Sequence, residues 1–345
     1  MYRNRFDRDG GEDVFVKRST ILRNSFAYYP VYENDGEKKY IVCYDPASKL
    51  DNSIVLIGEL FRDKEKGLML KIVNCENLIE LLPNGDKAII QKPQQIEMIK
   101  DLIINYNRGA LDYDNIELVC IDAGAGGGGF DISQFLLNDW VGSDGKRHLG
   151  LIDEEDPYMK LRVDDYPANI RKLQLFNFKR DKVQAYERTQ AAINQGLVMF
   201  PKSLNARNEM EIEEVASDGT TSIRYEKVSF DEMNSLIQID LTKEELVGMQ
   251  KQKRPNGTIV FELSPDAKQK NMHDDRVDCV AMMCNHLMEL RAQEVLALEE
   301  KPKTEFKEMF AKQKSANKSN SSNPFNGLGQ VNPLSTKYRR GGRFG

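Results

Sequence analysis

Two apolar runs that each stop at an aspartate dominate the hydrophobic pattern of the chain. Residues 40–44 are apolar and are followed by Asp45, and residues 118–121 are apolar and are followed by Asp122. Unbroken apolar runs of this length are typical of strands buried on both faces. The pattern therefore predicts two core strands whose last side chains emerge at a sheet edge.

The segments around these runs predict further strands and helices. Residues 53–61 and 67–79 are apolar and separated by a short turn, which predicts an antiparallel meander. Residues 91–110 have helical periodicity, with Gly109 as the expected stop, and the apolar face would carry Ile96, Ile99, Ile103 and Ile104.

The second half of the chain predicts helices and one hairpin. A helix is expected over 130–140, capped by Asp131 or Ser133, and another over 180–197. Pro255-Asn256-Gly257 lies between two strand-like pieces and indicates a hairpin. Residues 271–301 predict a long helix, with an apolar stripe of Val277, Val280, Ala281, Cys284 and Leu287.

Charge separates the body of the chain from its end. The 345 residues carry a net charge of −5, but ten of the 49 basic and only two of the 54 acidic residues lie from Lys301 onward. The tail is therefore about +8 and the body −13. An acidic body argues against a protein that coats nucleic acid, whereas the Lys, Asn, Ser and Gly of the tail predict disorder.

The composition also indicates where the protein resides and whether it binds zinc. No apolar run reaches the roughly 20 residues of a membrane span, and no signal peptide is evident, so a cytosolic protein is expected. Cys279, Cys284 and His286 lie on a predicted helix without a fourth ligand, which disfavours a zinc site.

The acidic residues supply the candidate chemistry. Asp45 and Asp122 end strands, and Asp275 and Asp278 share one face at the start of the last helix. One such aspartate is more often a turn former or a helix-dipole partner. Together, acids from three elements match a two-metal Mg²⁺ or Mn²⁺ site that would activate water and stabilise a leaving oxygen.

Three segments carry a resemblance to a known family. Residues 44–53 (YDPASKLDNS), 119–131 (VCIDAGAGGGGFD) and 272–282 (MHDDRVDCVAM) resemble the ribonuclease H-like nuclease domain of tailed-phage large terminase subunits. The resemblance implies an α/β fold: a mixed sheet flanked by helices, a β-hairpin near the active site and a disordered C-terminal tail. It implies a connecting arm over 1–39, the nuclease domain over 40–297 and a basic tail over 298–345.

The same resemblance implies an endonuclease that cuts double-stranded viral DNA during packaging in the host cytoplasm. Its implied partners are the terminase ATPase domain, the small terminase subunit and the portal protein. No G-x-x-x-x-G-K-[ST] loop occurs, so ATP hydrolysis is not assigned. The implied residues are Asp45, Asp122 and Asp275 as catalytic groups, Asp278 as a further metal ligand, Asp274 or His273 as assisting groups, and Lys251, Lys253 and Arg254 as candidate DNA contacts.

Three alternatives stay open at this point. Holliday-junction resolvases and transposases use the same fold and acid placement, and a structural module with a degenerate site is a non-enzymatic option. Gly124, Gly126 and Gly129 also satisfy G-x-G-x-x-G, a weak dinucleotide-binding signal. The acid expected about 20 residues on would be Asp144, which lies in a polar turn rather than at a strand end.

Overall fold

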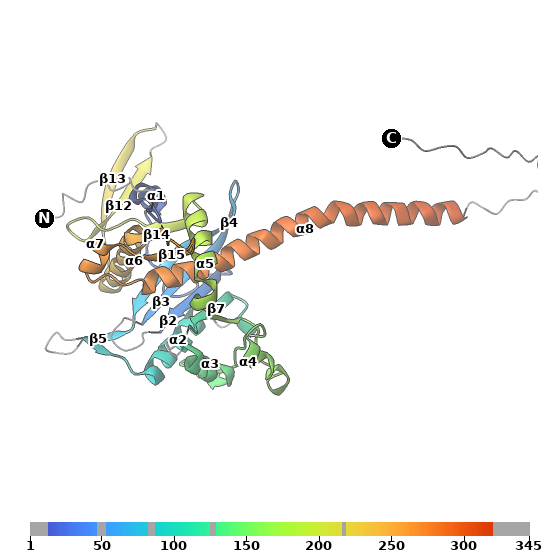
Figure 1. Cartoon of the computed structure of the whole chain (residues 1–345), viewed down its shortest axis with the longest axis horizontal. Coiled ribbons are helices and arrows are strands. Elements are labelled where there is room, and N and C mark those ends of the chain that lie inside the picture. Colours follow the sequence, from blue (N-terminus) through green and yellow to red (C-terminus); the bar gives the residue numbers. More distant parts are fainter. Residues whose placement is uncertain are drawn as a thin grey trace, which may run out of the picture. The chain divides into compact units, whose positions relative to one another are not determined.

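The computed structural model describes residues 13–46, 53–81, 87–108, 110–124, 129–215 and 219–319. They fall into two compact units, Met1–Ala292 and Gln293–Gly345. All strands within the described ranges belong to the first unit, which is shown as a ribbon in Figure 1.

A seven-stranded mixed sheet forms the centre of the first unit. Its strand order is β1-β11-β4-β3-β2-β7-β10. The antiparallel meander comprises β2 (Lys39–Asp45), β3 (Ile54–Asp63) and β4 (Gly67–Asn77). Beside β2, the sheet continues with two parallel strands, β7 (Ile116–Asp122) and then β10 (Leu173–Phe176). Beside β4, it continues with two further parallel strands, β11 (Val198–Pro201) and then β1 (Ser25–Phe26). This mixed sheet confirms the predicted α/β fold class.

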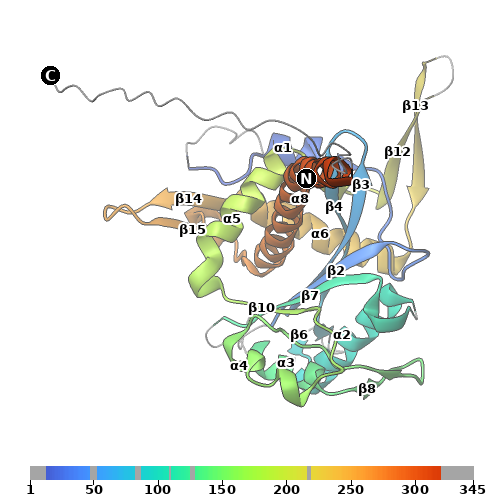
Figure 2. The ribbon, with the colours of Figure 1, turned by 90° about the vertical axis from the view of Figure 1, so that its right-hand side faces the viewer.

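Helices cover both faces of this sheet. They are α1 (Arg18–Arg23), α2 (Lys92–Asn107), α3 (Gly129–Leu137), α4 (Pro157–Lys160), α5 (Phe178–Asn194), α6 (Phe230–Gly248), α7 (Pro265–Gln269) and α8 (Asp275–Ser319), with 3-10 turns at Leu111–Tyr113 and Val163–Asp165. Figure 2 shows α5, α6 and the start of α8 on one face and α2 and α3 on the other. Two separate apolar cores result, one on each side of the sheet.

Four two-stranded hairpins extend from this framework. They are β5 (Ile79–Leu81) with β6 (Lys87–Ile89), β8 (Trp140–Val141) with β9 (Arg147–His148), β12 (Glu209–Val215) with β13 (Thr221–Lys227), and β14 (Met249–Lys253) with β15 (Ile259–Leu263). The last confirms the hairpin predicted at Pro255-Asn256-Gly257, where Gly257 takes the positive φ (85°) that glycine tolerates best.

Several boundaries differ from the sequence-based expectations. Asp131 and Ser133 lie inside α3, which begins at Gly129, so neither can be its N-cap. Helix α6, for which there was no sequence-based prediction, begins with a capping box formed by Ser229 and Glu232 and continues to Gly248. Gly109 and Gly126 lie outside the described residues.

Two elements lie within the predicted arm and tail, whose bounds stay predictions. The segment predicted as a connecting arm, 1–39, includes β1, which pairs with β11 in the main sheet. Helix α8 continues past Lys301 to Ser319, over a stretch that contains the helix formers Glu, Lys and Ala. Within the described residues, no helix combines the length and apolar character required to cross a bilayer.

Candidate metal centre

Asp45 and Asp122 end neighbouring parallel strands. Tyr44 of β2 is paired with Ile121 of β7, so the next position brings Asp45 level with Asp122. Tyr44 and Ile121 face the core formed with α2 and α3. Because side chains alternate along a strand, both aspartates lie on the opposite face, toward α5 and α8.

The first turn of α8 lies over the same sheet edge. The Sγ atom of Cys279 is 3.7 Å from the carbonyl oxygen of Ile54 and 3.9 Å from that of Cys43. Asp275 and Asp278 belong to this first turn, where acidic side chains are favoured by the helix dipole. The fold therefore brings together the acids predicted from two strands and one helix.

The electrostatics of Asp45 reflect this convergence. Its residue is 8% exposed, and burial raises the pKa of its carboxyl well above the usual range. The negative charges of Asp278, Asp275 and Asp122 raise it further. Asp45 is thus costly to ionise unless positive charge is supplied.

Two other acids of the cluster, Asp122 and Asp278, also have a raised pKa, and each accepts a hydrogen bond. Burial raises the pKa of Asp122, although the backbone N–H of Gly124 donates to its Oδ1 at 2.7 Å and opposes the rise. Burial raises the pKa of Asp278 to about 7, with Lys182 acting in the opposite direction. The hydroxyl of Tyr186 donates to Oδ1 of Asp278.

Lys182 and Tyr186 are site residues that sequence reasoning missed. Lys182 Nζ lies 3.1 Å from Oδ2 of Asp274 and 3.9 Å from Oδ1 of Asp278. Burial disfavours its ammonium, but Asp278 and Asp274 outweigh this effect and raise the pKa of Lys182. The two residues are spaced i, i+4 on α5, a pattern that predicts a shared face but not what that face contacts.

The donor set suits a hard divalent cation. Carboxylate oxygens are the preferred ligands of Mg²⁺ and Mn²⁺, and the negative charges of Asp278, Asp275 and Asp122 act on the buried carboxyl of Asp45 and raise its pKa further. Across the described residues, no group of three or more His, Cys, Asp or Glu side chains is placed so that it could hold a metal ion. His273 and Asp274 lie just before α8, and an assisting role for either stays a prediction.

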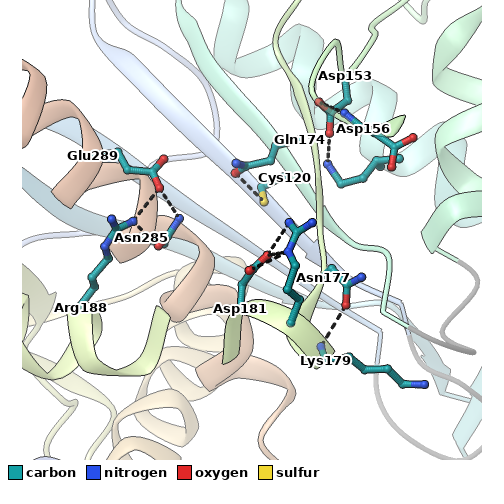
Figure 3. A network of polar contacts seen from close by, with 12 residues as sticks. Cys120, Asp153, Asp156, Gln174, Asn177, Lys179, Asp181, Arg188, Asn285 and Glu289 are labelled. Atoms are coloured by element: carbon teal, nitrogen blue, oxygen red, sulfur yellow. Dashed lines mark hydrogen bonds and ion pairs between the residues drawn. The ribbon is translucent and has the colours of Figure 1, made fainter. Parts of the chain in front are cut away.

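A polar network holds α5 against α8 beyond the acids. Arg188 Nη1 donates to Oδ1 of Asn285 and to Oε1 of Glu289, both at 2.6 Å. Figure 3 shows this cluster beside Cys120 and Gln174 of the neighbouring strands. The contacts fix the relative register of the two helices that supply Lys182 and Asp278.

The basic residues expected to contact DNA differ in their surroundings. Lys251 lies within β14, and its Nζ is 2.9 Å from Oε1 of Glu187. Lys253 ends β14, and Arg254 begins the exposed turn. Lys251 is thus engaged in the fold, whereas Lys253 and Arg254 stand at the hairpin tip.

The zinc and dinucleotide alternatives gain nothing from the structure. Cys279 and Cys284 are fully buried among apolar side chains, and His286 contacts Glu117 at 3.4 Å. Asp144 lies in the β8–β9 turn and bonds to His148, so it does not end the strand after the glycines. The N–H of Gly124 is directed at Asp122 rather than at a ligand.

Comparisons with known proteins gave structural matches alone. No protein-family model and no curated protein matches the sequence. The chain is similar in structure to the magnesium-bound large terminase nuclease of thermophilic phage G20c (12% identity, TM-score 0.40, covering 80% of this chain and 98% of that one). It is also similar to the large terminase nuclease domain of Thermus phage P74-26 (13%, 0.38, 76% and 91%). A third match is the nuclease domain of the large terminase subunit of bacterial virus Sf6 (11%, 0.37, 79% and 98%).

Proposed function

We propose that this chain is a divalent-metal-dependent endonuclease that hydrolyses phosphodiester bonds of double-stranded DNA. The observation that carries the proposal is the convergence of Asp45 and Asp122, level at the ends of adjacent strands, with Asp275 and Asp278 on the first turn of α8. The viral packaging role rests on the resemblance of residues 44–53, 119–131 and 272–282 to terminase nucleases. On that basis the ATPase domain, small subunit and portal are its partners, in the host cytoplasm.

The residues of the site would have three roles: they would bind the metal, orient a metal ligand and neutralise negative charge. Asp45, Asp122, Asp275 and Asp278 would hold Mg²⁺ or Mn²⁺, which supplies Lewis-acid activation of water and of the scissile phosphate. The N–H of Gly124 orients Asp122. Lys182 partly neutralises the cluster and offers positive charge to an approaching phosphate. Among the residues that the structure describes, no base-reading element is evident beside the acids, so little sequence preference is expected.

Plasmid nicking in Mn²⁺ tests the proposal. Asp45→Asn and Asp122→Asn should each abolish nicking while the circular-dichroism spectrum and urea midpoint remain close to those of the parent. Asp35→Asn is the matched control, because Asp35 precedes β2 at the opposite edge of the sheet and pairs with Lys38. Full nicking by either site variant would refute the proposed site, and preferential cleavage of a four-way junction would favour the resolvase alternative.

A further inference from the structure

The described start of the chain lies along the hairpin β14–β15. The backbone N–H of Phe15 donates to the carbonyl of Met249 at 3.2 Å, and that of Lys251 donates to the carbonyl of Asp13 at 2.8 Å. These bonds form an antiparallel bridge with the outer edge of β14. Residues 13–16, here termed the arm segment, thus cover an edge that would otherwise expose unpaired backbone groups.

The side chain of Phe15 connects this segment to α5. Phe15 is 1% exposed, and its ring centroid is 5.5 Å from those of both Tyr186 and Phe261. Tyr186 and Phe261 are themselves 5.2 Å apart. Gln190 of α5 also donates to the carbonyl of Phe15 at 2.6 Å. Three mutually packed rings therefore join the arm segment, the hairpin and α5.

Tyr186 links this aromatic cluster to the acidic site. Its side chain is fully buried, and its hydroxyl donates to Oδ1 of Asp278. A phenol is rigid, so the direction of its hydroxyl follows from the orientation of the ring. Packing against Phe15 and Phe261 sets that orientation, because close-packed aromatic side chains resist rotation.

We propose that Phe15 is a positioning residue for the metal centre, which it serves by fixing the ring of Tyr186 so that the hydroxyl holds Asp278 in its ligating orientation. Because the same segment bridges to β14, the position of the hairpin is coupled to this acid. The inference rests on the proposed function, in which Asp278 is a metal ligand. Partners that orient ligating carboxylates typically change metal affinity by about tenfold to a hundredfold when removed.

A double-mutant cycle on Mn²⁺ affinity tests whether Phe15 acts on Asp278 through Tyr186. Free Mn²⁺ is measured by electron paramagnetic resonance without DNA, on the full chain and on Phe15→Leu, Tyr186→Phe and the double variant. Each single substitution should weaken binding about tenfold. The double variant should be no weaker than Tyr186→Phe, because Phe15 acts through the hydroxyl that this variant lacks. Gln190→Leu, which loosens the arm segment without altering the rings, should shift affinity in the same direction.

A half-buried tyrosine and a buried phenylalanine away from the site provide matched controls. Tyr28→Phe removes a hydroxyl that donates to the carbonyls of Ile72 and Met199 at 2.8 and 3.0 Å. Phe200→Leu shortens a fully buried ring on β11. Both should lower the urea midpoint and leave Mn²⁺ affinity unchanged. An equal loss of affinity in these controls would mean a general packing effect and would overturn the proposal.

The outcomes separate this inference from the proposed function. Unchanged affinity in Phe15→Leu, or additive losses in the double variant, would overturn the positioning role while Mn²⁺ binding by the parent stands. Absence of Mn²⁺ binding by the parent, or binding that survives Asp45→Asn undiminished, would overturn the proposed metal centre and this inference with it.

Discussion

The guanidinium of Arg276 lies 2.7 Å from the carboxylate of Glu245, and the two side chains are only 4% and 5% exposed. Burial raises the pKa of Glu245, and Arg276 counteracts that rise. The pair joins α8 to α6 directly beside Asp275. The position of the first turn of α8, which carries the proposed metal ligands Asp275 and Asp278, therefore depends on this buried pair.

Arg276→Met should lower the free energy of unfolding by about 3–5 kcal/mol, because it leaves the Glu245 carboxylate buried without its partner. Adding Glu245→Leu should recover most of the loss. Urea titration at pH 9, above the pKa of about 8 to which burial raises Glu245, measures both. Arg18→Ala is the control: Arg18 and Glu244 are 38% and 30% exposed, so its cost should stay below about 1 kcal/mol. Equal costs for Arg276→Met and Arg18→Ala would contradict the prediction.

The raised pKa of Asp278 predicts an unusual pH dependence of stability without metal. Since burial raises this pKa from 3.8 to about 7, its stabilising contribution is complete below pH 4 and is lost as pH rises through 7. Asp278→Asn does not titrate, so its stability relative to the parent should increase between pH 4 and 7 and then level off. Thermal unfolding in a chelator measures this difference, for which about 4 kcal/mol is the limit. A difference independent of pH would contradict it; Asp35→Asn should show no such increase.

Lys182 supplies positive charge to the metal-free acidic cluster, so its removal should increase the stabilisation that a bound cation provides. In Lys182→Met the carboxylates of Asp274 and Asp278 lose their ion pairs, and the metal-free melting temperature should fall. Mn²⁺ should then raise the melting temperature more than in the parent. Lys202→Met, which breaks an exposed pair with Glu213, should leave the Mn²⁺-induced shift unchanged. A smaller shift in Lys182→Met would show that the ammonium assists binding instead.

Gly58 allows close packing between β3 and α8. A Cβ atom there would lie 2.6 Å from Cδ1 of Leu70 and 3.0 Å from Sδ of Met283. Gly58→Ala should therefore lower the free energy of unfolding by about 1–3 kcal/mol through overpacking. Gly36→Ala, with nothing within 4 Å of the added atom, is the control. Urea denaturation of the two variants decides, and equal midpoints would contradict the prediction.

The hairpin tip should contribute to DNA binding unequally. Lys253→Ala and Arg254→Ala are each expected to weaken binding to duplex DNA and to reduce the salt dependence by about one charge. Lys251→Ala should have a smaller effect, because Lys251 is paired with Glu187. Fluorescence anisotropy over a salt series measures both quantities, and an equal or larger effect at Lys251 would contradict the assignment.

The sequence alone determined the strands that carry the site and the residues that end them. Each apolar run stops at an aspartate, so the ends of β2 and β7 at Asp45 and Asp122 follow from the local pattern. The start of α8 near Asp275 and its apolar stripe follow from helical periodicity in the same way. These features depend on neighbours within a few residues, which the sequence displays directly.

Tertiary structure alone decided which distant groups complete the site. Lys182 and Tyr186 lie about ninety positions before the acids they contact, and nothing in the periodicity of α5 indicates that partner. The raised pKa of Asp45 likewise arises from burial together with charges on β7 and at the start of α8. Such effects depend on how the sheet and helices pack, and burial and charge proximity exist only once the chain has folded.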